Sequence, residues 1–110
     1  MNEYKPDRWV VLEVNNGKES INKVFAGWYG GYLAGDEWKL NSGNVKEEEF
    51  DDRWEFTGYS GSVYVCYKSC YGMSGYMDQV YESWQAQLKE SPDKGSIEII
   101  DMMYNVHVAE

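Results

Sequence analysis

The feature that most constrains this chain is a central segment in which large aromatic residues alternate with glycines. Residues 25–81 hold most of the 10 Tyr, 5 Trp and 11 Gly residues of the 110-residue sequence. A buried Trp or Tyr removes about 150–250 Å² from water and keeps one polar atom that needs a partner. Glycine lets the chain turn sharply. Large apolar side chains separated by turns therefore predict several short strands in place of one long element.

Alternating apolar and polar side chains predict where these strands lie. The predicted strands cover residues 8–15, 20–27, 37–41, 53–58, 62–68 and 96–100, and residues 102–108 extend the last strand or dock as a tail. Asn16-Gly17 and residues 41–44 are turn signals that favour antiparallel pairing of consecutive strands. The strand over residues 62–68 is apolar on both faces, which predicts a place in the middle of the sheet.

One amphipathic helix is predicted after Ser74, a suitable N-cap, and before Ser91-Pro92, which ends it. Its apolar residues recur every three or four positions: Met77, Val80, Tyr81, Trp84 and Leu88. A chain of this length folds as one domain. The sequence therefore predicts a single α+β domain over residues 1–110, with a twisted antiparallel sheet of five or six strands and one C-terminal amphipathic helix packed on one face.

The strongest compositional signal is a net charge of −9. Such a surface repels phosphate, so we expect no direct nucleic-acid binding, and a partner bound by charge should itself be basic. The same charge also keeps a small protein soluble without any partner. The polar start and the lack of a long apolar run predict a cytoplasmic protein that does not bind membranes.

Six consecutive residues place five carboxylates around one aromatic ring: Glu47, Glu48, Glu49, Phe50, Asp51 and Asp52. Charge runs of this kind usually form solvated loops. A recognition element is the other interpretation, because the carboxylates attract a basic surface and the ring adds an apolar contact. The sequence leaves both open.

A second candidate surface is the aromatic set around Gly30-Gly31. It consists of Trp28, Tyr29, Tyr32 and Trp38. Flat rings of this kind stack on sugars, bases and partner side chains, and they are enriched at interface centres. They also fill cores, so the set is either part of the interior or an exposed recognition surface.

Signals for catalysis, metals and cofactors are weak. Cys66, Cys70 and His107 offer three soft donors, whereas a structural zinc site needs four. Two cysteines four positions apart on one strand lie about 13 Å apart, too far for a disulfide, so both are expected as free thiols. No nucleophile elbow, phosphate loop or calcium loop has the required spacing. We expect a non-enzymatic protein without metal or cofactor.

Three stretches carry a resemblance to a known group of proteins. They are residues 23–32 (KVFAGWYGGY), residues 38–43 (WKLNSG), and residues 58–62 (GYSGS) with Tyr64, Cys66, Lys68, Tyr71 and Gly72. Across residues 9–72 the chain resembles small uncharacterised proteins of tailed bacteriophages and viral metagenomes. The resemblance implies expression in a bacterial cytoplasm, where small acidic phage proteins often occupy a host or defence protein. It implies no activity and no binding residues.

Together these features predict a phage-type protein that binds, and thereby inhibits, a basic host or defence protein through its acidic stretch and neighbouring aromatics. One alternative is a small-ligand or glycan-binding module that uses the aromatic set as a platform. Another is a structural protein that self-associates, for example as a homodimer. The least favoured alternative is an enzyme with a reactive Cys70, which precedes the helix start.

Overall fold

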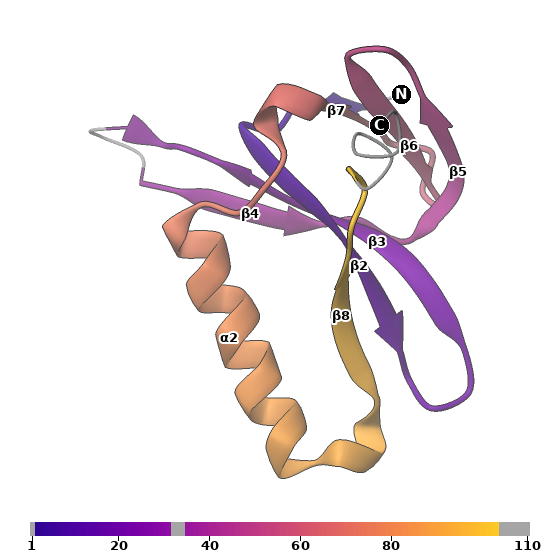
Figure 1. Cartoon of the computed structure of the whole chain (residues 1–110), viewed down its shortest axis with the longest axis vertical. Helices are drawn as coiled ribbons and strands as arrows, with labels where there is room; N and C mark the ends of the chain where they lie inside the picture. Colours follow the sequence, from indigo (N-terminus) through magenta and orange to yellow (C-terminus); the bar gives the residue numbers. More distant parts are fainter. Residues whose placement is uncertain (1, 32–34, 104–110) are drawn as a thin grey trace, which may run out of the picture.

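The computed structural model describes residues 2–31 and 35–103 of the chain. Within these residues the protein is an α+β fold with two four-stranded sheets and the helix α2 (Figure 1). The α+β class agrees with the sequence prediction, but the single sheet of five or six strands is wrong. Tyr32, His107 and most of the predicted tail over residues 102–108 lie outside the described residues.

The first sheet, which we call the β2 sheet, is antiparallel throughout. Its strands in spatial order are β4 (Glu37–Leu40), β3 (Ser20–Trp28), β2 (Arg8–Asn15) and β8 (Ser96–Ile100). The loop between β2 and β3 covers residues 16–19, as the predicted strand bounds require, and contains the turn signal Asn16-Gly17. In it the Asn16 side chain accepts hydrogen bonds from the N–H groups of Lys18 and Glu19, both at 2.9 Å.

The second sheet, the β6 sheet, contains the two strands that the sequence pattern did not predict. In spatial order it has β1 (Glu3–Tyr4), β7 (Val63–Tyr67), β6 (Arg53–Gly58) and β5 (Asn44–Glu49). β1 runs parallel to β7, and the other pairs are antiparallel. β7 is an interior strand, and its Tyr64 and Val65 point to opposite faces yet are each 4% exposed, as expected for a strand covered on both sides.

The main core lies between the facing sides of the two sheets. Trp9, Val11 and Val24 of the β2 sheet pack with Phe56 and Cys66 of the β6 sheet, and all five are fully buried. Burial of a Trp requires a partner for its indole N–H. Trp9 Nε1 donates to the Tyr67 carbonyl oxygen at 2.6 Å, which ties the two sheets together.

The helix α2 (Gly75–Glu90) covers the opposite face of the β2 sheet (Figure 1). It begins as predicted after Ser74, whose hydroxyl accepts a hydrogen bond from the Met77 N–H at 3.2 Å. Trp84 packs on Phe25 and Trp38, with ring centroids 5.1 and 5.3 Å apart. The helix is followed by the short 3₁₀ helix η2 (Pro92–Lys94) and by β8, the strand predicted over residues 96–100, so it lies between strands in the C-terminal part of the described chain.

Candidate functional site

The acidic stretch of the sequence forms the edge of the β6 sheet. β5 carries Glu47, Glu48 and Glu49, and the turn into β6 carries the other acidic residues. Every residue from 45 to 52 is exposed. Among the strands of residues 2–31 and 35–103, β5 has a neighbour on one side only, so this acidic segment lies on a sheet edge.

The pairing of β5 with β6 distributes the carboxylates over both faces of the sheet. Glu47 lies opposite Phe56, whose face is turned toward the β2 sheet. Glu48 lies directly opposite Glu55 on the outer face. Like charges in such a position destabilise a sheet. Lys46 offsets part of this repulsion, because its Nζ lies 3.5 Å from Glu48.

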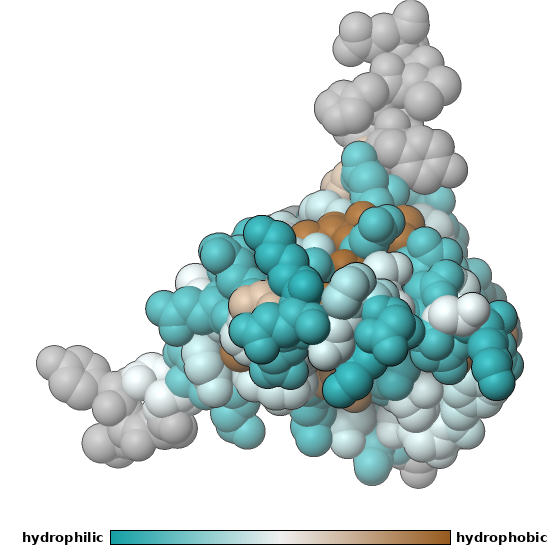
Figure 2. All heavy atoms as spheres, turned by 90° about the horizontal axis from the view of Figure 1, so that it is seen from below, coloured by the Kyte–Doolittle hydropathy of each residue, from teal (hydrophilic) through white to brown (hydrophobic). Residues whose placement is uncertain are grey.

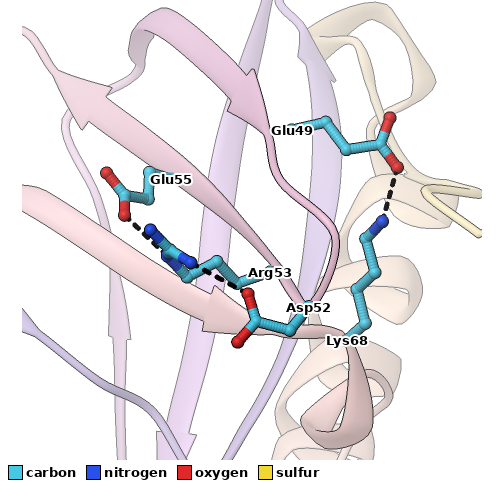
Figure 3. Close-up of polar contacts among 5 residues, drawn as sticks. All are labelled: Glu49, Asp52, Arg53, Glu55 and Lys68. Carbon is cyan, nitrogen blue, oxygen red and sulfur yellow. Dashed lines mark hydrogen bonds and ion pairs between the residues drawn. The ribbon is translucent and has the colours of Figure 1, made fainter.

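Two basic side chains neutralise further carboxylates of the hairpin (Figure 3). Arg53 donates to Glu55 at 2.7 Å and to Asp52 at 2.8 Å, and these hydrogen bonds, with Glu55 first, raise the pKa of its guanidinium. Lys68 Nζ lies 2.7 Å from Glu49. Among the described residues Asp51 has no hydrogen bond or ion pair through its side chain, so it is the carboxylate most available to a partner.

Phe50 sits in the same turn and is 38% exposed. The Arg53 guanidinium lies over its ring at 4.3 Å from the centroid. This cation–π contact holds the ring at the end of the hairpin. The hairpin therefore presents an aromatic ring beside the carboxylates, as the sequence suggested for a recognition element.

The aromatic set is not brought together by the described structure. Trp38 packs with Phe25 on the helix side of the β2 sheet. Trp28 lies on the opposite face, against Tyr4. Tyr29 is 56% exposed, and the face shown in Figure 2 is mostly hydrophilic, with hydrophobic residues visible only in small areas. Trp28 and Trp38 thus cannot form one stacking platform.

An open groove of about 470 Å³ lies between the start of β3 and β5. Its walls include Glu13, Ile21, Asn22, Val45, Glu47 and Tyr59. The side-chain amides of Asn22 and Asn44 both donate to Oε2 of Glu47, at 3.3 and 3.0 Å. These two hydrogen bonds fix the orientation of the carboxylate in the groove.

The exposed ring of Tyr59 is held in the groove by two linked turns. The Tyr59 N–H donates to the Gly43 carbonyl at 3.0 Å, and the Ser60 N–H donates to the Ser42 hydroxyl at 3.1 Å. Gly43 has φ 124°, and a Cβ there would overlap the Ile21 side chain and lie 2.9 Å from the Tyr59 ring. Glycine at this position therefore lets Ile21 and Tyr59 form one wall.

A buried amide connects this wall to the β2 sheet. Asn41 is 6% exposed, and its Oδ1 accepts from the Val24 N–H at 2.9 Å and the Gly43 N–H at 3.3 Å. Its Nδ2 donates to Asn44 at 2.7 Å. Buried amides are costly unless they are satisfied in this way. Asn41 thus positions the start of β5 relative to β3.

The groove was not predicted as a site. The sequence did contain one signal for the groove. The alternation along β2 places Glu13 on the same face as the core residues Trp9 and Val11. A charged residue on a core-facing position is unusual and indicates a place where the opposing layer ends. The pairing partners of Glu13 could not be read from the sequence.

The two cysteines of the described part of the chain differ in burial. Cys66 is buried, and burial is the main cause that raises the pKa of its thiol. Cys70 is half-buried, and both thiols are free, as predicted. No group of three His, Cys, Asp or Glu side chains within residues 2–31 and 35–103 lies close enough to hold a metal ion. No helix in these ranges is long and apolar enough to cross a membrane.

Comparison of the chain with protein-family models, curated proteins and solved structures found no match in any of the three sets.

Proposed function

We propose that this protein is a non-enzymatic binding protein that engages a basic protein through the hairpin β5–β6. The observation that carries the proposal is the position of the acidic stretch on an exposed edge strand and its turn. Carboxylates in such a place attract a basic partner and raise its rate of association. Phe50 adds an apolar contact beside them.

A partner that binds the carboxylates of the hairpin has to compete with the Lys and Arg side chains that already pair with them. Exposed pairs such as Lys46–Glu48 are worth only about 0–1 kcal/mol, so a well-placed Lys or Arg of the partner can replace them. Asp51 needs no such exchange. The mechanism is blockade, in which the hairpin covers a basic surface that the partner needs for its own ligand.

The cellular setting of the proposal comes from the resemblance to small phage proteins. In that setting the protein acts in a bacterial cytoplasm, and its partner is a host or defence protein with a basic surface. A partner that handles nucleic acid fits best, since its phosphate-binding surface is basic.

Capture from a bacterial lysate tests the proposal. The hairpin variant carries Glu48→Gln, Glu49→Gln, Asp51→Asn and Asp52→Asn. The control variant removes the same number of exposed charges from α2 and η2 with Asp78→Asn, Glu82→Gln, Glu90→Gln and Asp93→Asn. Mass spectrometry should identify basic proteins that wild type and control retain at physiological salt and that the hairpin variant loses. Equal capture by all three proteins would contradict the proposal.

A further inference from the structure

We propose that Gln85 and Tyr81 of α2 block the outer edge of β8, and that without this block the edge pairs with β8 of a second copy of the chain. The inference goes beyond the proposed function and does not depend on the hairpin β5–β6. Three observations support it: the apolar sequence of β8, the direction of its backbone groups, and the contacts that α2 makes with one of them.

β8 is an apolar edge strand of the β2 sheet. Among the strands of residues 2–31 and 35–103, its neighbour β2 lies on one side only. Its sequence is SIEII, and isoleucine is among the residues that most favour strands. Edge strands are usually protected by short length, by charged side chains or by a covering element. β1 and β4 have two and four residues, and β5 is acidic, whereas β8 carries one charged residue, Glu98.

The pairing of β2 with its neighbours determines which backbone groups of β8 face this edge. In an antiparallel pair, alternate residues direct their N–H and C=O groups toward the neighbouring strand. The Asn16 N–H donates to the Glu19 carbonyl at 3.1 Å in the β2–β3 loop, so the even-numbered residues of β2 face β3 and the odd-numbered residues face β8. The odd-numbered residues of β2 lie opposite the even-numbered residues of β8. Ile97 and Ile99 therefore direct their backbone groups away from β2.

Two side chains of α2, which lies alongside β8 (Figure 1), contact this edge. Gln85 Nε2 donates to the Ile97 carbonyl oxygen at 2.5 Å, and the Tyr81 hydroxyl donates to the same oxygen at 3.4 Å. A further strand would need this carbonyl as an acceptor. Such a strand would have to displace both side chains, so Gln85 and Tyr81 block its pairing.

The edge of β8 is complementary to itself. Two copies of one strand can pair antiparallel about a two-fold axis. The register that bonds both isoleucines places Ile97 opposite Ile99 of the second copy. Glu98 then faces Glu98 of the second copy, and like charges directly opposite each other destabilise a sheet. Removal of this charge should therefore tighten the dimer.

A matched pair of variants tests the inference. The edge variant carries Gln85→Ala and Tyr81→Phe, which remove both donors and keep the aromatic ring. The control variant carries Gln87→Ala and Tyr76→Phe, the same changes at exposed positions of the same helix. Light scattering measures the mass of each protein as it is concentrated. The buffer contains about 0.15 M salt, where a Debye length of about 8 Å screens the repulsion between acidic copies.

We expect wild type and the control to remain monomeric and the edge variant to approach twice the monomer mass as its concentration rises. Addition of Glu98→Gln to the edge variant should tighten the dimer about twofold to fivefold. Addition of Glu82→Gln, which removes the same charge from an exposed position on α2, should change it by less than about twofold.

Amide hydrogen exchange, followed by NMR, shows whether the dimer forms at this edge. In wild type the amide protons of Ile97 and Ile99 should exchange faster than those of Glu98 and Ile100, which face β2. In the edge variant, exchange at Ile99 should slow by about tenfold or more at the concentration where the mass doubles. The wild-type pattern requires no substitution, so it tests the edge independently of how well the variants fold.

Four results would overturn the inference. An edge variant that stays monomeric at its highest soluble concentration would show that the two side chains block nothing. Equal association of the edge variant and the control would assign the effect to a general change in α2. Slow exchange at Ile99 in monomeric wild type would mean that the edge is already occupied. Association without slower exchange at Ile99 would place the contact elsewhere. Lysate capture judges the hairpin separately in every case.

Discussion

At the scale of single residues, the two cysteines differ in how deeply their side chains are buried. Cys66 lies between the two sheets with no exposed surface, whereas Cys70 ends the 3₁₀ helix η1 (Lys68–Cys70) and is half-buried. Burial disfavours the thiolate, so the pKa of Cys66 lies above its ordinary value of 9.0. A thiol held in the neutral form is a poor nucleophile. Cys66 is therefore a packing residue.

We expect a disulfide reagent to label Cys70 in the native protein and Cys66 only after unfolding. The folded-state pKa of Cys66 is raised above its unfolded value, so its contribution to stability is fully present below about pH 8 and is lost as the pH rises past about 9. Urea unfolding compared at about pH 8 and about pH 10 should show a fall in the free energy of unfolding that is smaller in Cys66→Ala. Rapid labelling of both thiols in the native state would contradict this assignment.

At the scale of elements, the strands with a buried face were the predictable ones. The bounds predicted for β2, β6 and β8 agree with the structure, because apolar side chains alternate along each. β5 was missed, since Val45 and the acidic residues after it are all exposed and give no alternation. Its strand conformation comes from pairing with β6, a tertiary effect that overrides local pattern.

The sequence also did not predict which strands that are far apart in the chain lie side by side. The predicted strands that pair consecutively are β2 with β3, β3 with β4, and β6 with β7. The strands predicted over residues 37–41 and 53–58 lie in different sheets, so the prediction of sequential pairing is wrong there, and β8 lies beside β2 and β1 beside β7. Both pairings join segments that are far apart in the sequence, and no local turn signal encodes them. The hairpin tip could be predicted as acidic and aromatic from composition alone. The position of Glu13 directly opposite Glu98 could not be predicted, because it exists only once β2 and β8 are paired.

The helix α2 should depend strongly on one side chain. Trp84 contacts both Phe25 and Trp38 on the β2 sheet, and truncation of a core Trp costs about 3–5 kcal/mol. We expect Trp84→Ala to lower the free energy of unfolding by about 3 kcal/mol in urea titrations. Tyr76→Ala on the same helix is the control, since Tyr76 is 40% exposed and should cost less than about 1 kcal/mol. Similar losses in the two variants would mean that the Trp84 contacts do not anchor the helix.

At the scale of the whole molecule, the net charge of −9 opposes folding by self-repulsion. The ion pairs of the described residues act in the other direction, but most are exposed; the pair Lys46–Glu48, for example, has side chains 62% and 46% exposed. Each such pair contributes at most about 1 kcal/mol, and salt screens it. The long-range repulsion is also screened, so the response to salt shows which of the two is larger.

We expect repulsion to dominate. Raising sodium chloride from about 0.01 to 0.2 M, which shortens the Debye length from about 30 Å to below 10 Å, should increase the free energy of unfolding by on the order of 1 kcal/mol. Chloride is chosen because sulfate would strengthen apolar burial by itself. The hairpin variant, with four fewer negative charges, should gain less from the same salt. A fall in stability with added salt would instead show that the ion pairs around Arg53 and Lys68 outweigh the repulsion, and that these carboxylates are already committed within the protein.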